Sequence, residues 1–272
     1  AGLGLYLFLV HMFTAERPFI PLPMFRDRYF VLATLVMFTT NTIMMASSAL
    51  LAPYLQNLSG YPVASAGLLM APRGIGTMMA MVVSGRLGMR ADQRGLMACG
   101  LLILGWSLHD MSTWTPDVSA TWLVTVMMVQ GVAMGWIWNP VTIIAFTSLP
   151  AHLRGDATAL QSLVRNVGSA IGISVTSFTL ARSVQASHAG LTADLTPFNR
   201  LLQGHWSVPR MLGPATTHGA ELLDQMVNRQ ALIIAYNNDF RMMSFVVIPA
   251  LLMLLLLRRA RRQPTALPVV AE

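Results

Sequence analysis

The chain contains 272 residues, of which 54% are hydrophobic and only 11% are charged, and its mean hydropathy is +0.57. Soluble domains carry about 25% charged residues, so this composition excludes an ordinary water-soluble enzyme, a disordered chain and a disulfide scaffold. The net charge of +7 comes from 18 arginines without any lysine, and there is a single cysteine, Cys99. We predict an all-α fold, a polytopic transmembrane helical bundle.

The apolar segments of the chain predict six full membrane spans and a partial one. A helix needs about 20 apolar residues to cross the hydrocarbon core, and residues 1–13 are too few, so we interpret them as the end of a truncated transmembrane helix. Residues 14–181 are predicted to hold five transmembrane helices with short loops. These helices are Tyr29–Leu55, Ala64–Leu87, Gly95–Met111, Trp122–Leu149 and Ala157–Ala181.

The C-terminal third is predicted to contain one more span. Residues 182–239 are rich in proline and polar side chains at first and then form an amphipathic pattern over Ala220–Tyr236. We predict an external loop with an amphipathic helix there, the last transmembrane helix over residues 240–257, and a cytoplasmic basic tail over residues 258–272.

The arginines predict the orientation of these spans. Eleven of them lie in Thr14–Arg28, Arg86–Arg94, Pro150–Asp156 and the tail after Leu257, and none lies in the alternate loops Gln56–Val63 and Ser112–Thr121. Because cytoplasmic loops are enriched in basic residues, we expect the arginine-rich loops and the C-terminus on the cytoplasmic side of the membrane. This placement explains the basic charge without a nucleic-acid partner.

Aromatic side chains gather near the predicted external ends of the spans. An aromatic belt at the membrane surface is one interpretation, and the filling of gaps between helices is the other. The residues are Tyr54, Tyr61, Trp114 and Trp122.

Four polar residues lie at predicted membrane depth and are candidates for a substrate or proton pathway: Asn41, Arg73, Gln130 and Arg165. An arginine at the centre of a membrane helix costs at least about 2.5 kcal/mol, so each such charge needs a role. It either lines a water-filled path or forms a structural salt bridge or carbonyl clamp with a neighbouring helix. No acidic residue is expected in the middle of any span. Asp239, at the external mouth of the last span, either binds protons or cations or marks a solvated helix end.

Small residues and one proline indicate how the helices pack. Gly168 and Gly172 are spaced for close helix approach on a polar stripe, and Gly131 and Gly135 repeat the spacing. Pro140 frees one backbone carbonyl and is expected to bend its helix.

Several motifs together resemble the C-terminal half of fourteen-helix drug:proton antiporters of the major facilitator superfamily, the EmrB/QacA type. They are Gly67–Gly76 (GLLMAPRGIG), Gly85–Arg94 (GRLGMRADQR), Gln130–Gly135 (QGVAMG), Leu149–Gly155 (LPAHLRG) and Arg165–Gly172 (RNVGSAIG).

The resemblance implies a bacterial inner-membrane permease that exports amphiphilic compounds against proton entry. Its partners would be membrane lipids, a missing N-terminal half, a periplasmic adaptor and an outer-membrane channel. It also implies that Gly85 permits a tight turn in a cytoplasmic loop, where Arg86, Arg90 and Arg94 pair with neighbouring helix ends.

Two other functions remain open at this stage. One is a lipid-modifying membrane enzyme, which would place His188, His205 or His218 beside a carboxylate at the bilayer surface. The other is a non-transporting subunit that pairs with a separate N-terminal half. We favour transport without enzymatic activity. We expect no metal or cofactor, because the sequence lacks a P-loop, an HExxH pair and a Cys/His cluster.

Overall fold

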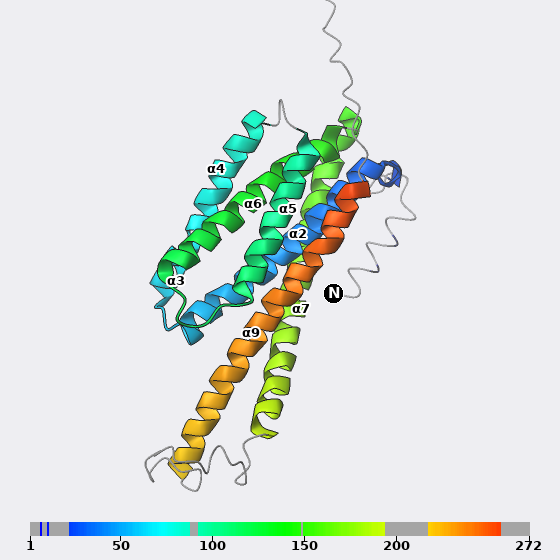
Figure 1. The fold of residues 1–272 in the computed structure, drawn as a ribbon. Coiled ribbons are helices and arrows are strands. Elements are labelled where there is room, and N and C mark those ends of the chain that lie inside the picture. The colour runs from blue at the N-terminus through cyan, green and yellow to red at the C-terminus, as the bar shows by residue number, and fades with distance from the viewer. Residues whose placement is uncertain are drawn as a thin grey trace, which may run out of the picture.

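The computed structural model describes residues 22–87, 92–147, 149–193 and 217–256, together with Tyr6 and Val10. Every regular element within these residues is a helix, and the helices pack as one bundle (Figure 1). Five stretches are long and apolar enough to cross a membrane: Arg28–Leu58, Val63–Arg86, Ala120–Thr147, Arg154–Thr192 and Glu221–Leu255. These findings confirm the predicted all-α, multi-pass membrane bundle. The predicted tail and nearly all of residues 1–13 lie outside the described part.

The helices follow the predicted order along the chain. A short 3-10 turn, η1, precedes α2, and α2 continues directly into the π-helical segment η2. After a turn come α3 and α4, and then the long helices of the rest of the bundle. Their bounds are η1 Leu22–Arg26, α2 Arg28–Pro53, η2 Tyr54–Leu58, α3 Val63–Met70, α4 Pro72–Leu87, α5 Gln93–Met111, α6 Ala120–Thr147, η3 Ala151–Leu153, α7 Arg154–Ala193 and α9 Thr217–Leu256.

Helix α5 is not among the five apolar stretches, although the sequence predicts a span there. Nevertheless it packs along α6 and α9 inside the bundle (Figure 1). Its Leu101, Leu104 and Leu108 are fully buried. Because these leucines face other helices, the helix belongs to the core of the fold in spite of its lower hydropathy.

The predicted boundaries at residues 181 and 239 do not coincide with the ends of helices. Helix α7 continues to Ala193, and α9 runs without a break from Thr217 to Leu256. In Figure 1 the two helices pack side by side and project beyond the other helices of the bundle. Burial of Val227 and Ala231 stabilises α9 in this projection. The loop between α7 and α9 lies outside the described residues, and the position of the membrane along this pair stays a prediction.

Local signals in the sequence explain where several helices begin. Asp27 caps α2 by accepting a hydrogen bond of 2.8 Å from the backbone N–H of Tyr29. Asp92 caps α5 in the same way, with 3.3 Å to the N–H of Arg94. The turn between η2 and α3 contains Gly60 at a φ of 73°, a conformation that side chains with a Cβ rarely adopt.

One expectation about local structure is wrong, and one open alternative is decided. Gly85 does not form a turn, because it lies inside α4 with a helical backbone, and a Cβ there would meet open space. Tyr54 and Trp114 do not face lipid, because both are buried between helices. Trp122, in contrast, is exposed at the start of α6. The interpretation of gap filling therefore holds for the first two aromatic residues.

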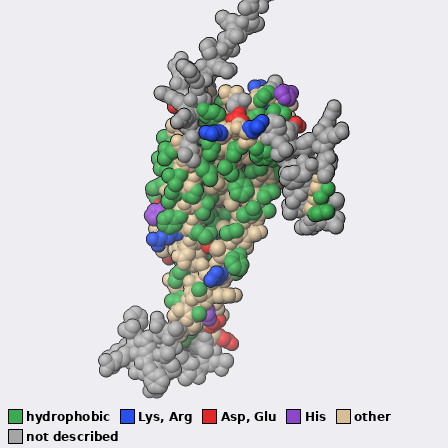
Figure 2. All heavy atoms as spheres, turned by 90° about the vertical axis from the view of Figure 1, so that its right-hand side faces the viewer, with side chains coloured by type: hydrophobic (Ala, Val, Ile, Leu, Met, Phe, Trp, Pro, Cys, Tyr) green, Lys and Arg blue, Asp and Glu red, His purple; other side chains and the backbone are tan. Residues whose placement is uncertain are grey.

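The sides of the bundle are apolar. Figure 2 shows hydrophobic side chains over the middle of one face, with charged side chains mainly towards its two ends. Helices α4 and α7 are the least covered, and they expose large side chains such as Met78, Val82, Val167 and Phe178. A surface of this kind requires lipid or other apolar helices around it.

Candidate functional site

A break in one predicted span places an arginine in the bundle interior. Pro72 has no backbone N–H and starts a new helix, so α3 ends at Met70 and α4 begins at Pro72. At the junction the N–H of Ala71 donates to the carbonyls of Gly67 and Leu68, at 3.1 and 3.3 Å. Arg73 follows the break directly and is only 8% exposed.

Neutral groups from two other helices hold the Arg73 guanidinium. Nη1 donates to Ser48 Oγ of α2 at 2.6 Å, and Nη2 donates to Ser47 Oγ at 3.3 Å and to Gln130 Oε1 of α6. The Nε of Arg73 and the Nε2 of Gln130 are buried without a partner in the described part of the chain. None of these contacts brings a negative charge, so the described residues leave the buried cation uncompensated. We call Ser47, Ser48, Arg73 and Gln130 the Arg73 cluster.

Glycines let α4 approach α6 beside this cluster. Gly131 lies against the backbone carbonyl of Arg73, and a Cβ on Gly135 would lie 2.7 Å from the carbonyl oxygen of Thr77. Gly76 on α4 faces the backbone of α6 in the same manner. Gly76 was not among the predicted packing residues, although its place in the APRGIG motif offered a signal.

The second predicted group forms a clamp between α2 and α7. Asn41 is 1% exposed, and its Nδ2 donates to the carbonyl of Arg165 and to Ser169 Oγ, both at 2.7 Å. Gly168 and Gly172 lie against α2, where a Cβ on Gly168 would be 2.9 Å from Thr42 Oγ1. The polar stripe of α7 therefore packs on α2.

Arg165 contributes its backbone rather than its charge to this clamp. Its side chain is half-buried, and its guanidinium makes no hydrogen bond or ion pair with the residues that the structure describes. The clamp and the Arg73 cluster share one face of α2, because Asn41 and Ser48 are seven residues apart, or about 10 Å along the helix. The four residues predicted for the pathway thus form two neighbouring pairs.

Asp239 belongs to neither pair. It is not a solvated helix end, because it is 2% exposed and lies inside the continuous helix α9. Its hydrogen-bonding neighbour is Thr179 of α7. The apolar stretch Glu221–Leu255 contains Asp239 in its interior, and the expectation that no acidic residue lies in the middle of a span stays a prediction.

The remaining predicted residues lie at helix contacts or ends. Helix α6 continues through the buried Pro140, and the preceding Asn139 donates to Ser84 Oγ of α4 at 2.8 Å. Arg86 is exposed in the last turn of α4, where a positive charge is favourable to the helix dipole. Arg94 is half-buried in the first turn of α5, and Arg90 lies outside the described residues.

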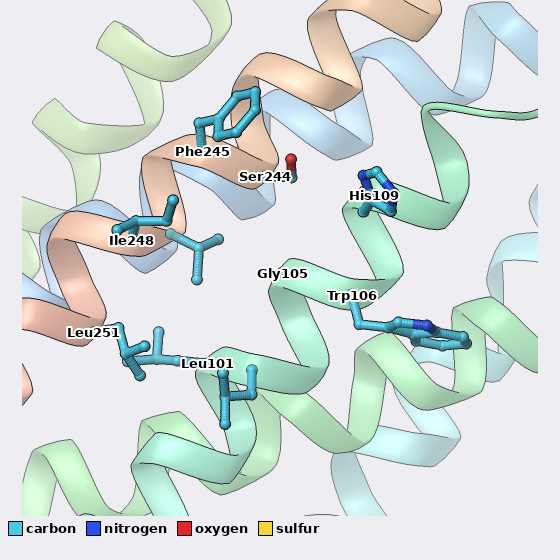
Figure 3. A pocket seen from close by; sticks show the side chains of 10 residues that line it. Leu101, Gly105, Trp106, His109, Ser244, Phe245, Ile248 and Leu251 are labelled. Carbon is cyan, nitrogen blue, oxygen red and sulfur yellow. The ribbon is translucent and has the colours of Figure 1, made fainter.

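Two open grooves on the outside of the bundle are separate from these polar residues. Figure 3 shows one of them, between α5 and α9, with a volume of 270 Å³ and a lining that includes Trp106, His109 and Phe245. The other, between α2, α7 and α9, has a volume of 460 Å³ and includes Tyr236. Both are mainly apolar, and neither contains Arg73.

One histidine lies beside a carboxylate, as the enzyme alternative requires. His188 Nε2 is 3.3 Å from Asp224 Oδ1, where α7 and α9 project from the bundle. Asp224 is exposed, and its second oxygen accepts a bond of 2.9 Å from Asn228. This geometry is typical of a solvated contact between two helices. His205 lies outside the described residues, as does the side chain of His218.

The chain is similar to curated multidrug exporters over most of its length. It is 25% identical to the multidrug export protein EmrB of Haemophilus influenzae over 84% of this chain and 45% of that protein. It is 26% identical to EmrB of Escherichia coli K12 over 89% of this chain and 48% of that protein. A third relative, the probable multidrug resistance protein EmrY of E. coli K12, is 26% identical over 88% and 47%. The chain therefore spans about half the length of the curated relatives it matches.

The profile of the Major Facilitator Superfamily matches residues 9–173, which include both polar groups. These relatives are transporters by name, so the comparisons favour transport over the enzyme alternative. The chain belongs to the Major Facilitator Superfamily.

Proposed function

We propose that this chain is the C-terminal bundle of a proton-coupled multidrug efflux permease that exports amphiphilic compounds. The observation that carries the proposal is the Arg73 cluster: a buried guanidinium held by Ser47, Ser48 and Gln130 with no counter-ion among the described residues. A buried charge of this kind is costly, and intramembrane charges mark substrate and ion pathways. The names of the relatives support export as the direction.

In this proposal Arg73 acts through its charge. A cation beside a carboxylate favours the ionised form of that carboxylate, so Arg73 would bias proton release from an acidic residue facing it across the bundle interface. Asn41 and Gln130 add neutral hydrogen-bonding groups along the same path. Arg165, whose guanidinium has no partner among the described residues, would supply a second charge.

The proposal requires a second helical bundle. Alternating access rocks one bundle against another around a central site, and the relatives are about twice as long as this chain. The uncovered apolar sides of α4 and α7 are compatible with such a neighbour and with lipid. A periplasmic adaptor and an outer-membrane channel would complete the export route.

Efflux measurements on the complete permease test this function. We expect Arg73→Gln to abolish export of amphiphilic dyes from cells, with unchanged insertion, because the variant keeps a hydrogen-bonding side chain but loses the charge. Arg165→Gln should reduce export as well. The matched control is Arg241→Gln, an exposed arginine of α9. Full export by Arg73→Gln, or equal losses in all three variants, would refute the role of the cluster.

We also propose a bacterial inner-membrane location with the C-terminus in the cytoplasm. Single cysteines in a Cys99→Ser background test it. Ser59→Cys and Thr115→Cys should react with a membrane-impermeant maleimide added to intact spheroplasts, and Arg86→Cys only after permeabilisation. Reaction of all three from one side would contradict the proposed orientation.

A further inference from the structure

The carboxyl of Asp239 is a buried acid that the proposed pathway around Arg73 does not use. Its Oδ2 has no hydrogen-bond partner among the described residues, and Thr179 of α7 is its polar neighbour. The ion pair found in the described part of the chain joins His188 to Asp224, so Asp239 has no counter-ion there. An ionised carboxylate buried without a cation costs several kcal/mol. Binding of a proton would neutralise the carboxyl and remove this cost.

The surrounding helices carry few groups that could compete for this role. Near the level of Asp239 they are Tyr236 and Arg241 of α9, Tyr54 of η2, Arg182 of α7, His109 and Asp110 of α5, and the exposed Asp117 of the loop after α5. Both arginines and His109 are exposed. Asp110 accepts hydrogen bonds from two indoles, those of Trp114 at 2.9 Å and Trp122 at 3.0 Å. Within the described residues, only the two tyrosines are buried around the carboxyl as titratable groups.

An aromatic layer separates Asp239 from one end of the bundle. The ring of Tyr54 lies 5.5 Å from that of Tyr236, edge to face, and 6.3 Å from that of Trp114. All three are nearly fully buried. Asn237 Nδ2 donates to the carbonyl of Trp114 at 3.2 Å and so fixes α9 at this level. Asp239 comes two residues later, about 3 Å further along the helix. Its carboxyl therefore lies just inside the aromatic layer.

The aromatic layer has its own unsatisfied polar atoms. The hydroxyl of Tyr54 and the Oδ1 of Asn237 are buried without partners in the part of the chain that the structure describes. Buried polar atoms usually have partners, and water entering between these side chains would supply them. A small separation of η2 from α9 would thus connect the carboxyl with solvent.

We propose that Asp239 is a proton-binding site of this bundle, distinct from the Arg73 cluster and covered by Tyr54, Trp114 and Tyr236. On release, the O–H bond of the carboxyl breaks, its electron pair stays on the carboxylate, and the proton passes to water at the end of the bundle that carries η2. On loading, the same transfer runs in reverse. The use of this proton to drive export rests on the proposed function, whereas its binding does not.

Carbodiimide labelling of the complete, unmodified permease in lipid vesicles tests the site. N,N′-dicyclohexylcarbodiimide is apolar and reacts with protonated carboxyls, and mass spectrometry of peptides locates the product. We expect label on Asp239 in acid that decreases in alkali, and no label on Asp224, an exposed carboxylate of the same helix. Absence of label on Asp239 at every pH, or labelling equal to that of Asp224, would overturn the proposal.

Infrared spectroscopy supplies an independent readout. The carbonyl band of a protonated carboxyl should lose the intensity of one group in Asp239→Asn and keep it in the matched control Asp224→Asn. An unchanged band in Asp239→Asn would also overturn the site.

For transport, Asp239→Asn should keep substrate binding and lose export driven by a pH gradient. Full export by this variant would refute the coupling role. A labelled Asp239 in a permease that exports nothing would leave the proton site standing and refute the proposed function instead.

Discussion

The hydrogen-bonded clamp between α2 and α7 allows a quantitative prediction. Asn41→Ala removes two interhelical hydrogen bonds of 2.7 Å, one to the carbonyl of Arg165 and one to Ser169 Oγ. Such bonds contribute about 0.6 kcal/mol each on average in membrane proteins, with a maximum near 1.7 kcal/mol. We therefore expect the free energy of unfolding to fall by about 1.2 kcal/mol, and by no more than about 3.4 kcal/mol.

The expected loss of stability is moderate because the two partners of Asn41 are also hydrogen-bonded to each other. Ser169 Oγ already donates to the Arg165 carbonyl at 2.9 Å, and that bond persists in the variant. Unfolding in mixed micelles of a mild and a denaturing detergent, followed by circular dichroism, measures the change. Efflux by the complete permease, measured in parallel, shows whether the clamp also matters for transport.

A double-mutant cycle isolates the contact between Asn41 and Ser169. Combining Asn41→Ala with Ser169→Ala should give a coupling energy of about 0.6 to 1.7 kcal/mol. The control combines Asn41→Ala with Thr142→Ala, because Thr142 is exposed on α6 and bonds only within its own helix. That pair should be additive within about 0.5 kcal/mol. Equal coupling in both cycles, or an unchanged stability of Asn41→Ala, would refute the proposed clamp.

Three further substitutions test a close helix contact, a positive φ and a hydrogen bond. Gly131→Ile forces a side chain onto the backbone of α4 and should lower the free energy of unfolding by about 1–3 kcal/mol. In the control Gly85→Ala the new Cβ meets open space, so its stability should be unchanged or slightly higher. Thermal unfolding compares the two variants, and equal effects would contradict the close contact between α4 and α6. Gly60→Ala places a Cβ on a residue with a φ of 73° and should lower the free energy of unfolding by about 1–2 kcal/mol in the same assay. A stability equal to that of Gly85→Ala would contradict this prediction. Trp114→Phe removes the hydrogen bond of 2.9 Å to the Asp110 carboxylate and should lower the free energy of unfolding by about 1.5–3 kcal/mol. Unfolding in detergent measures this change, and an unchanged stability would mean that the bond does not stabilise the fold.

The positions of the helices could be predicted from the sequence because apolar length is a local property. Five predicted spans agree with the observed helices to within a few residues at most ends, and Asp27 is recognisable as a cap. The start of the final span is the exception. The amphipathic pattern ends at Tyr236 and the predicted span begins at residue 240, and no pattern in the sequence decides whether a helix continues through the polar run Asn237 to Asp239 between them. Packing against α2, α5 and α7 lets the helix continue through this run.

The composition of the candidate site was also partly predictable. Arg73, Arg165, Asn41 and Gln130 stand out by themselves, because polar side chains at membrane depth are costly wherever they point. The sequence does not specify that Arg73 binds Ser47, Ser48 and Gln130, residues 25 to 57 positions away. These contacts depend on the rotation of α2, α4 and α6 about their axes.

Composition and the lengths of the apolar segments thus determined an all-α membrane protein and the approximate extent of its helices, and the sequence motifs carried the family resemblance. Hydrophobic length and charge are summed along the chain and need no knowledge of neighbours. Only the tertiary structure decided that Arg165 contributes its carbonyl to the Asn41 clamp, that Tyr54 and Trp114 are buried, and that Asp239 is enclosed. Burial and hydrogen bonding belong to pairs of helices, and their partners lie far apart in the sequence.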